Sequence, residues 1–241
     1  MFPVTKDAEL GKQFDSEIRN KSKEYPILKN RPDVKTYITN VGNRVLASPD
    51  VLLKDQFVYQ FEIIKDDSTI NAFCTPGGYV YVYTGLLKYV DNEATLAGII
   101  AHEIAHAERR HATNQMTAQY GTQALLELAS GQIGETGTQI AGVVAGLGFL
   151  KYSRSDEEEA DAYSFQYLRS TPYYPGGIKY FFVKIGDGKQ SNALETLLST
   201  HPASQDRLDH VNQMLKDAGN PQPSEANIFA KRYQQFKKGL P

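Results

Sequence analysis

The sequence has one cysteine, no long hydrophobic run and no large excess of either charge. A single cysteine, Cys74, excludes an internal disulfide framework, so stability must come from packing and bound metal. The longest apolar run, residues 140–150, is about half of the ~20 residues that cross a bilayer, so no transmembrane segment is expected. A net charge of −2 gives no electrostatic footprint for nucleic acid or for an anionic membrane.

The beginning of the chain also lacks a recognisable targeting signal. Residues 1–6 do not have the pattern of a signal peptide, and no cysteine for lipid attachment stands near them. Either the protein is cytosolic, or its numbering begins after a removed targeting segment. The 241 residues are 41% hydrophobic and 11% aromatic, enough for one sizeable core, so a single domain over residues 1–241 is expected.

The most informative stretch is residues 101–106, Ala-His-Glu-Ile-Ala-His. Two histidines four apart on a helix project from one face, so His102 and His106 can reach the same metal ion. Glu103 lies beside them and can take a proton from a water on that metal. The motif is typical of a catalytic zinc site.

The flanking residues favour a buried helix over residues 91–111. Asp91 or Asn92 can cap its beginning, Glu93 suits its positive N-terminal end, and mainly apolar residues follow. Polar side chains on such a helix must be satisfied by something, and a zinc ion would satisfy them. The alternative is a buried helix whose histidines hydrogen-bond to backbone or carboxylates.

A second polar cluster lies at residues 152–163. Its acidic run can be the solvated face of a helix over residues 155–170. That helix also has a buried side, however, and a carboxylate as third ligand leaves the fourth position of a catalytic zinc to water. Asp161 could orient a ligand histidine through its other ring nitrogen. Spacing alone does not choose the ligand among Asp156, Glu157, Glu158 and Glu159.

Two further histidines follow these clusters. His111 stands five residues after His106, about 140° round a helix, so it is a poor ligand for the same ion and a capping or supporting role is expected. His201 precedes Pro202 in a loop, where side chains are often positioned for sites. It could donate to an oxyanion or bind the metal in a resting state. The alternative is a helix-capping or surface histidine.

The remaining patterns predict helices around a small sheet. Residues 5–25 and 33–46 read as amphipathic helices that pack as an antiparallel pair. Residues 57–64 and a segment near 69–74 read as strands, and residues 79–83 alternate strictly, so a hairpin with a Pro-Gly turn is expected. One strand should border the metal site, where an extended peptide could pair with it; the alternative is an ordinary sheet edge.

Residues 112–150 read as helical segments interrupted by glycines. Such helices would suit a mobile cover over a cleft, or they could pack loosely without any gating role. Residues 208–215 should form an amphipathic helix, residues 220–224 a linker, and residues 224–238 a basic C-terminal helix.

Several ordered blocks resemble the HtpX/BepA-like zinc metallopeptidases, a gluzincin family. The resemblance is spread over residues 5–215 and rests on Asn71-Ala72-Phe73 with Pro76-Gly77-Gly78, Thr84-Gly85-Leu86-Leu87, the motif from His102 to His106 with His111, Tyr152-Ser153-Arg154 with Glu157 to Asp161, and Ser199-Thr200-His201-Pro202 with Arg207. It implies zinc ligands at His102, His106 and Glu157, a general base at Glu103, an aspartate partner at Asp161 and a histidine near the metal at His201.

The chain departs from that family in several respects. It has neither the transmembrane helices of the HtpX branch nor the tetratricopeptide repeats of the BepA branch, and no export signal is visible. Cys74 stands where a small apolar residue is usual. Members often take part in protein quality control in the bacterial cell envelope, so the resemblance implies a periplasmic or envelope location, with the cytoplasm as the alternative.

Together these observations predict an α+β, zincin-like metallopeptidase domain, mostly helical, with a small and mainly antiparallel sheet. The expected reaction is hydrolysis of peptide bonds in polypeptide substrates with Zn²⁺, and His201 or Arg207 would steady the oxyanion. The competing hypothesis is a zinc-stabilised chaperone or assembly factor, in which His201 or residues 112–150 block the fourth metal position. A third is a metal-free helical binding protein with a fortuitous motif.

Overall fold

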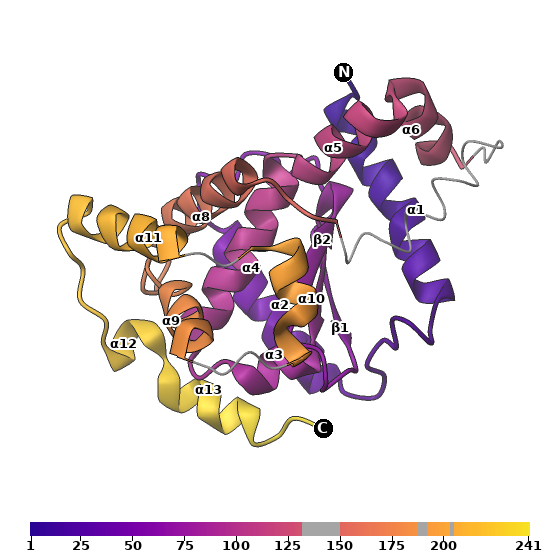
Figure 1. Ribbon diagram of the computed structural model, residues 1–241. Helices are drawn as coiled ribbons and strands as arrows, with labels where there is room; N and C mark the ends of the chain where they lie inside the picture. The colour runs from indigo at the N-terminus through magenta and orange to yellow at the C-terminus, as the bar shows by residue number, and fades with distance from the viewer. Residues whose placement is uncertain (132–149, 188–191, 203–204) are drawn as a thin grey trace.

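The computed structural model describes residues 1–131, 150–187, 192–202 and 205–241, and it shows a small sheet among helices (Figure 1). The strands are β1 (Gln60–Ile64), β2 (Ala72–Thr75) and β3 (Tyr79–Tyr83). The central strand, β3, is parallel to β1 and antiparallel to β2. The predicted class, mostly helical with a small sheet, is confirmed. The sheet is mixed rather than mainly antiparallel, because the chain passes through β2 before it returns along the direction of β1.

The alternating sequence of β3 separates the two faces of this sheet. Successive side chains of a strand point to opposite faces. The tyrosines of β3 pack in one buried cluster, and its valines belong to the main core: Tyr79, Tyr81 and Tyr83 on one side, Val80 and Val82 on the other. Phe73 joins the tyrosines, whereas Cys74 faces the main core. The β2–β3 hairpin is as predicted, with the turn η2 (Pro76–Gly78) between the strands.

The first two helices cover opposite faces of the sheet, so the prediction that they pair with each other is wrong. After η1 (Val4–Lys6), α1 (Asp7–Asn20) packs on the turn η2, and its Ile18 lies in the tyrosine cluster. In contrast, α2 (Pro32–Leu46) packs on β1 and contributes to the main core. An apolar stripe shows that one face of a helix is buried, but it does not show which element covers that face.

Several elements differ in length from the sequence prediction. The strand expected over residues 57–64 begins at Gln60, because Tyr59 has a φ of 41°, outside the extended range. The short helix after the hairpin is α3 (Thr84–Tyr89). The C-terminal helix is divided into α12 (Glu225–Ile228) and α13 (Ala230–Lys237), because Phe229 between them is left-handed with a φ of 50°.

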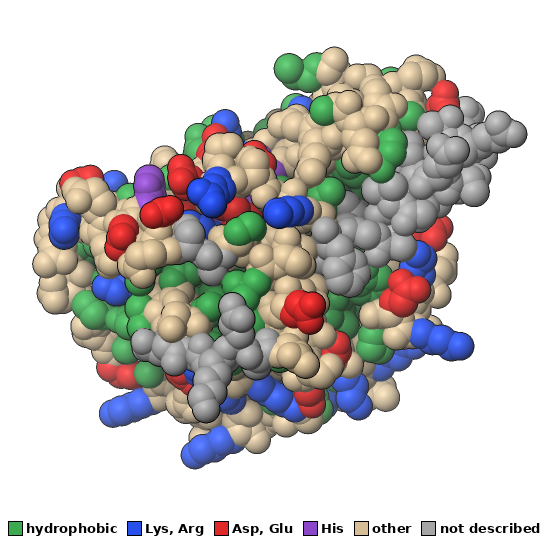
Figure 2. Space-filling model, viewed as in Figure 1, with side chains coloured by type: hydrophobic (Ala, Val, Ile, Leu, Met, Phe, Trp, Pro, Cys, Tyr) green, Lys and Arg blue, Asp and Glu red, His purple; other side chains and the backbone are tan. Residues whose placement is uncertain are grey.

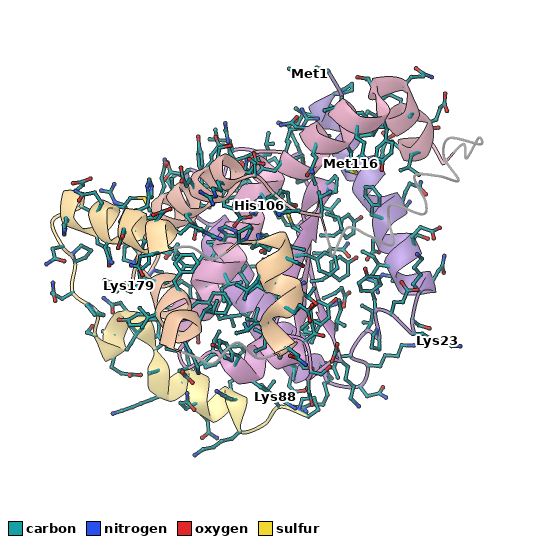
Figure 3. All side chains as sticks on the ribbon, in the orientation of Figure 1. Met1, Lys23, Lys88, His106, Met116 and Lys179 are labelled. Carbon is teal, nitrogen blue, oxygen red and sulfur yellow. The ribbon has the colours of Figure 1, made fainter. Side chains whose placement is uncertain are left out.

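The two helices predicted to carry metal-binding residues are neighbours. The histidine motif lies on α4 (Glu93–Glu108), and Figure 3 shows His106 near the middle of the molecule. Asn92 caps α4 by accepting a hydrogen bond from the Thr95 backbone N–H at 2.8 Å. The acidic cluster lies on α8 (Arg154–Arg169), which packs along α4. Their contact includes a hydrogen bond of 3.0 Å from Ser164 Oγ to the Gly98 carbonyl.

The other described helices surround this pair. They are α5 (His111–Tyr120), α6 (Thr122–Ala129), α9 (Lys179–Asp187), α10 (Glu195–Thr200), which follows η4 (Asn192–Leu194), and α11 (Gln205–Asp217). Figure 2 shows hydrophobic side chains on the face of the molecule that carries α9. No helix in the described ranges is long and apolar enough to cross a membrane. Residues 132–149, part of the glycine-interrupted segment 112–150, lie outside those ranges, so the role of that segment as a cover stays a prediction.

Candidate metal centre

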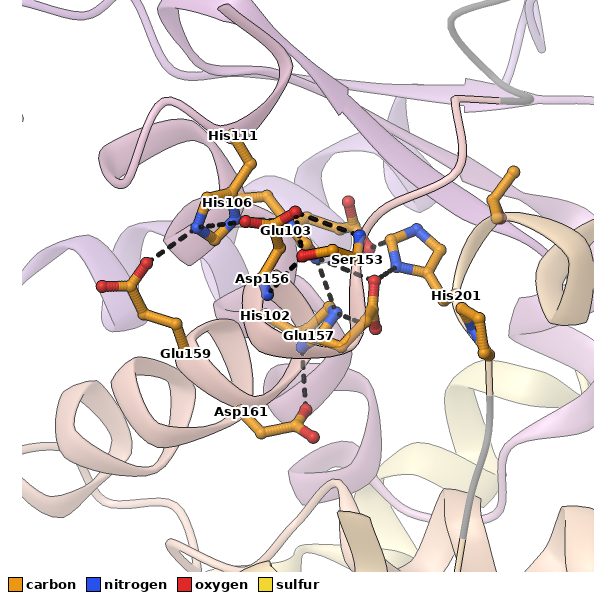
Figure 4. A network of polar contacts seen from close by, with 12 residues as sticks. His102, Glu103, His106, His111, Ser153, Asp156, Glu157, Glu159, Asp161 and His201 are labelled. Carbon is orange, nitrogen blue, oxygen red and sulfur yellow. Dashed lines mark hydrogen bonds and ion pairs between the residues drawn. The ribbon is translucent and has the colours of Figure 1, made fainter. Parts of the chain in front are cut away.

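His102 and His106 of α4 meet Glu157 of α8 (Figure 4). The Nε2 atoms of the two histidines are 2.9 Å apart. Glu157 Oε2 lies 3.4 Å from His102 Nε2, and Glu157 Oε1 lies 3.5 Å from His106 Nε2. All three side chains are buried. Two imidazoles and one carboxylate therefore converge on a single point between the helices.

His201 adds a fourth side chain to this group. It directly follows α10, and its Nδ1 lies 2.8 Å from Glu157 Oε1. One nitrogen or oxygen atom from each of the four residues lies within 4.8 Å of the other three. The four residues come from three segments that are far apart in the sequence, so only folding assembles the group.

The geometry of the group fits a tetrahedral metal ion. Zinc binds histidine nitrogen at about 2.0–2.1 Å, which separates neighbouring ligand atoms of a tetrahedron by roughly 3.3 Å. The three distances among His102, His106 and Glu157 run from 2.9 to 3.5 Å. Glu103 Oε2 is buried and makes no hydrogen bond to any described residue, an arrangement that calls for a missing partner. This donor set could hold zinc, with Glu103 ready to bond to a water nearby.

One of the four candidate acidic residues, Glu157, is brought to the histidines. The capping box at the start of α8 puts Glu157 in its first turn, on the side that faces α4. Asp156 is used in that capping box, Glu158 is exposed, and Glu159 contacts His111. Spacing left this choice open because it depends on where α8 begins and how it packs. Glu157 is also the residue that the family resemblance implies, and its role as a metal ligand stays a prediction.

Asp161 and Arg207 contact the side chains of His102 and Glu157. Asp161 Oδ1 lies 2.9 Å from His102 Nδ1. Arg207 donates from Nε and Nη2 to the two carboxylate oxygens of Asp161, each at 2.7 Å, and its Nη1 lies 2.6 Å from Glu157 Oε2. Burial acts to raise the pKa of Asp161, but the charge and hydrogen bonds of Arg207 outweigh it and lower that pKa. Arg207 therefore bridges two carboxylates of the site.

Burial changes the proton affinity of the polar side chains on α4. It lowers the pKa of His106 well below the usual value and raises the pKa of Glu103. It also acts to lower the pKa of His102, but hydrogen bonds to Asp161 and Glu157 outweigh it and raise that pKa to about 9. A neutral His106 can ligate a cation directly, whereas a cation at His102 must displace a proton.

His111 lies behind His106 rather than among the four converging residues. Helix α4 ends at Glu108, and Arg110 has a left-handed φ of 60° before α5 begins at His111. Arg110 is held in this conformation by donating to Asp7 Oδ2 at 2.7 Å. The turn places His111 Nδ1 2.8 Å from His106 Nδ1. The predicted angle of 140° assumed a continuous helix, so that reasoning was wrong, although the supporting position agrees with the prediction.

An apolar pocket lies beside the group, and the sequence patterns did not predict it. Water-sized spheres fit in only about 20 Å³ of it, and His102, Glu103, His201 and Arg207 form its polar wall. The apolar walls come mainly from α9 and the residues around it: Ile99, Ile178, Phe181, Phe182, Ile185 and Leu197. These residues belong to no chemical motif. The amphipathic pattern of residues 179–187 was the one signal that could have indicated a buried face here.

Comparison with known proteins agrees with this geometry. A profile of Peptidase family M48 matches residues 32–215. The beta-barrel assembly-enhancing protease of Yersinia pestis is 32% identical over 221 residues, which cover 83% of this chain and 43% of that protein. The metalloprotease LoiP of Escherichia coli (strain K12) is 30% identical over 193 residues, 76% of this chain and 70% of LoiP. The mitochondrial metalloendopeptidase OMA1 of Schizosaccharomyces pombe is 28% identical over 185 residues, 76% of this chain and 53% of OMA1.

The match covers the whole candidate centre. Residues 32–215 include the histidine motif, the acidic cluster of α8, His201 and Arg207. The chain spans less than half the length of the beta-barrel assembly-enhancing proteases that it matches. The chain belongs to peptidase family M48.

Proposed function

We propose that this chain is a zinc-dependent endopeptidase that hydrolyses peptide bonds in unfolded or misfolded proteins. The observation that carries the proposal is the convergence of His102, His106 and Glu157 beside Glu103, a buried carboxylate with an unpartnered oxygen. In this assignment the three converging residues are the zinc ligands. Residues 1–241 act as one peptidase domain.

The chemistry is divided among the residues around the centre. When bound, zinc lowers the pKa of a water molecule and polarises the carbonyl group of the scissile peptide. Glu103, whose Oε2 is buried without a hydrogen-bond partner among the described residues, would take a proton from such a water and later donate it to the leaving amine. His201, with Nε2 3.8 Å from Glu103 Oε1, would donate from Nε2 to the carbonyl oxygen as that oxygen gains negative charge; because its Nδ1 lies 2.8 Å from Glu157 Oε1, this role requires the doubly protonated imidazolium. Arg207 keeps Asp161 and Glu157 in position instead of reaching the oxyanion.

Two features of the site support a polypeptide as the substrate. Strand β2 is at the edge of the sheet and packs against α4, so an extended peptide can add to it through main-chain hydrogen bonds. Its four residues are buried in this state, so binding requires the segments that cover them to move. Apolar side chains line the pocket beside the centre, but in this state it has room for little more than one water molecule, so its walls would have to move before a hydrophobic side chain of an unfolded protein could enter.

The relatives suggest where such an activity belongs. Proteins that are named beta-barrel assembly-enhancing protease share 28–32% identity with this chain. We infer that the chain works in protein quality control at the bacterial cell envelope, in or near the periplasm. A cytoplasmic enzyme is the alternative, and fractionation of cells that produce the protein from its own gene distinguishes the two.

The test measures zinc content and cleavage of unfolded casein on the same preparation. We expect stoichiometric zinc and casein cleavage in the wild type, and retained zinc without cleavage in Glu103→Gln. Glu158→Gln, on the exposed side of α8, is the matched control and should behave like the wild type. A wild-type protein that binds no zinc, or a fully active Glu103→Gln variant, would contradict the proposal.

A second candidate function is a latent peptidase that acts mainly as a chaperone or assembly factor. It is favoured by His201, which has a ring nitrogen among the converging atoms and could occupy the fourth metal position. Tyr152 stacks on the His106 ring with centroids 4.0 Å apart, and its backbone N–H donates to the Thr200 carbonyl at 3.2 Å. The segments that carry Tyr152 and His201 thus cover the centre together.

The variant His201→Ala separates the two candidates. If His201 blocks the fourth position, the variant should cleave casein faster than the wild type, and the visible spectrum of the Co²⁺-substituted protein should change. If His201 is the oxyanion donor of an open site, the variant should cleave more slowly, by roughly 10²- to 10³-fold for the loss of one such donor.

A further inference from the structure

The two histidines of the metal motif are held from behind in different ways. His102 has a carboxylate directly behind it, since its Nδ1 lies 2.9 Å from Asp161 Oδ1. His106 has no carboxylate in that position among the described residues, and its Nδ1 lies 2.8 Å from the Nδ1 of another imidazole, His111. The orientation of His106 therefore depends on what holds His111 in turn.

The contacts form a continuous chain from the metal site to the protein surface (Figure 4). His111 is buried, and its Nε2 lies 2.8 Å from Glu159 Oε2. Arg109 donates from Nε to the other Glu159 oxygen at 3.0 Å. The Glu159 side chain is 38% exposed, so its charge is partly solvated. The buried imidazole of His111 thus links the partly exposed carboxylate of Glu159 to the ring of His106.

Hydrogen-bond chemistry allows one proton arrangement when His106 binds a metal. The Nε2 atom of His106 faces His102 and Glu157, so this nitrogen would give its lone pair to the ion and the proton would sit on Nδ1. His111 must then accept at Nδ1, which requires that its own proton sit on Nε2. That proton is donated to Glu159, whose carboxylate can only accept. Every donor in this arrangement has an acceptor.

We propose that His111 and Glu159 are positioning residues that hold His106 in the tautomer and ring orientation needed to bind the metal. The inference rests on the proposed metal site and adds two residues to it. Glu159 fixes the tautomer of His111, and His111 fixes that of His106, in the same way that a carboxylate behind a metal-bound histidine raises its basicity. The stacked ring of Tyr152 limits rotation of His106 from its other side.

The competing explanation is that His111 and Glu159 merely tie α5 to α8. A structural tie would change stability when it is removed, but it would not specify which nitrogen of His106 carries the proton. The two explanations therefore differ in their effect on zinc affinity at equal fold and on the imidazole signals of His106.

The test compares zinc affinity, measured by competition with a chelator, in four variants of the full chain. His111→Ala removes the acceptor, and we expect its affinity to fall roughly 10- to 100-fold. His111→Asn should recover much of the loss, because its amide oxygen can accept from His106 Nδ1–H. Glu159→Gln should lose less than His111→Ala, since its amide oxygen still accepts from His111. Glu158→Gln, the neighbouring and exposed glutamate, is the matched control and should bind zinc like the wild type.

Nitrogen-15 NMR of the zinc-loaded protein gives the readout that a structural tie would not move. We expect a slowly exchanging Nδ1 proton on His106 in the wild type and in Glu158→Gln, and its loss in His111→Ala. If His111→Ala binds zinc as tightly as the control, or keeps that protected proton, the proposal is overturned. If His111→Ala does not fold, His111→Asn and Glu159→Gln decide it through the same two measurements.

Failure of the proposed function can be told apart from failure of this inference. A wild-type protein that binds zinc but does not cleave casein contradicts the peptidase assignment, while the zinc affinities still test His111 and Glu159. A wild-type protein that binds no zinc overturns both.

Discussion

Two buried glutamates on the same helix have opposite surroundings. Glu93 lies in the first turn of α4 and Glu103 ten residues later, and their exposed fractions are 0% and 2%. Glu103 keeps one carboxylate oxygen without a hydrogen bond in the described part of the chain, and burial raises its pKa. Glu93, in contrast, is surrounded by donors. Burial alone therefore does not distinguish a structural carboxylate from a candidate catalytic one.

Hydrogen bonds to Glu93 connect the C-terminal helix α13 to α4. Arg232 of α13 donates to both carboxylate oxygens, one of them at 2.6 Å, and Arg44 of α2 donates at 3.2 Å. The hydroxyl groups of Tyr37 and Tyr173 also donate to it, the latter at 2.6 Å. Buried charge is tolerated when it is paired and hydrogen-bonded in this way. Glu93 thus joins α2, α13 and the segment after α8 at the beginning of α4.

Helix α4 is therefore anchored by hydrogen bonds at both ends, whereas a buried carboxylate in its middle lacks a full set of hydrogen-bond partners. At its last residue, Glu108 accepts from the backbone N–H groups of Leu52 and Leu53 and, at 2.6 Å, from the Tyr59 hydroxyl. Between these anchors the motif residues lie on a helix that is fixed at both ends, and Glu103 keeps one carboxylate oxygen without a hydrogen bond to any described residue. Rigid support of this kind is what keeps a reactive group at its working geometry.

The largest effect on stability is expected at Glu93, where both carboxylate oxygens accept hydrogen bonds at the beginning of α4. Glu93→Gln removes the charge that two arginines share, and we expect the free energy of unfolding to fall by about 3 kcal/mol. The value is at the low end for a buried pair because the Arg232 and Arg44 side chains are 42% and 43% exposed and can be solvated. Urea unfolding of the metal-free protein measures it. Equal stability of Glu93→Gln and Glu158→Gln would show that the cluster is not an anchor.

The next effect concerns the support behind His102. Asp161→Asn keeps an acceptor for His102 but removes the charge that binds Arg207. We expect zinc affinity to fall roughly 10- to 100-fold, or about 1.4 to 2.8 kcal/mol. Chelator competition measures the affinity, and circular dichroism checks the fold. An unchanged affinity in a folded variant would mean that Arg207 and Asp161 only stabilise the packing of α11 on α8.

A smaller loss is expected at the other end of α4. In Glu108→Gln a single amide oxygen must accept the hydrogen bonds that two carboxylate oxygens accept in the wild type. We expect the free energy of unfolding to fall by about 1.5 kcal/mol. Thermal unfolding beside Glu93→Gln tests the order of the two effects. If Glu108→Gln destabilises more than Glu93→Gln, the backbone contacts at residues 52–53 are the stronger anchor.

The smallest effect on stability should come from Glu103, the proposed general base. Glu103→Gln removes a charge that burial disfavours and that has an incomplete set of partners. In the metal-free protein we expect a change of less than about 1 kcal/mol, with the variant the more stable of the two. The comparison with Glu93 fails if urea unfolding shows that Glu103→Gln loses as much stability as Glu93→Gln.

Local patterns in the sequence determined much of this protein. The spacing of His102, Glu103 and His106 put them on one helix, because an α-helix repeats every 3.6 residues whatever surrounds it. The alternation over residues 79–83 fixed which side chains of β3 share a face, since a strand repeats every two residues. Asn92 was one of two caps that the sequence allowed, and the hydrogen bond from Thr95 identifies it. These features depend on neighbours in the chain alone.

Tertiary structure decided the contacts between distant segments. The choice of Glu157, the separation of α1 from α2 and the apolar wall from α9 all depend on which buried faces meet, and an apolar stripe does not specify its partner. The position of His111 depends on the left-handed turn at Arg110, which is stabilised by Asp7, more than one hundred residues away. The sequence by itself identified the candidate reactive residues on α4. Packing decided which residues from distant segments contact them, because long-range contacts are selected by the whole fold.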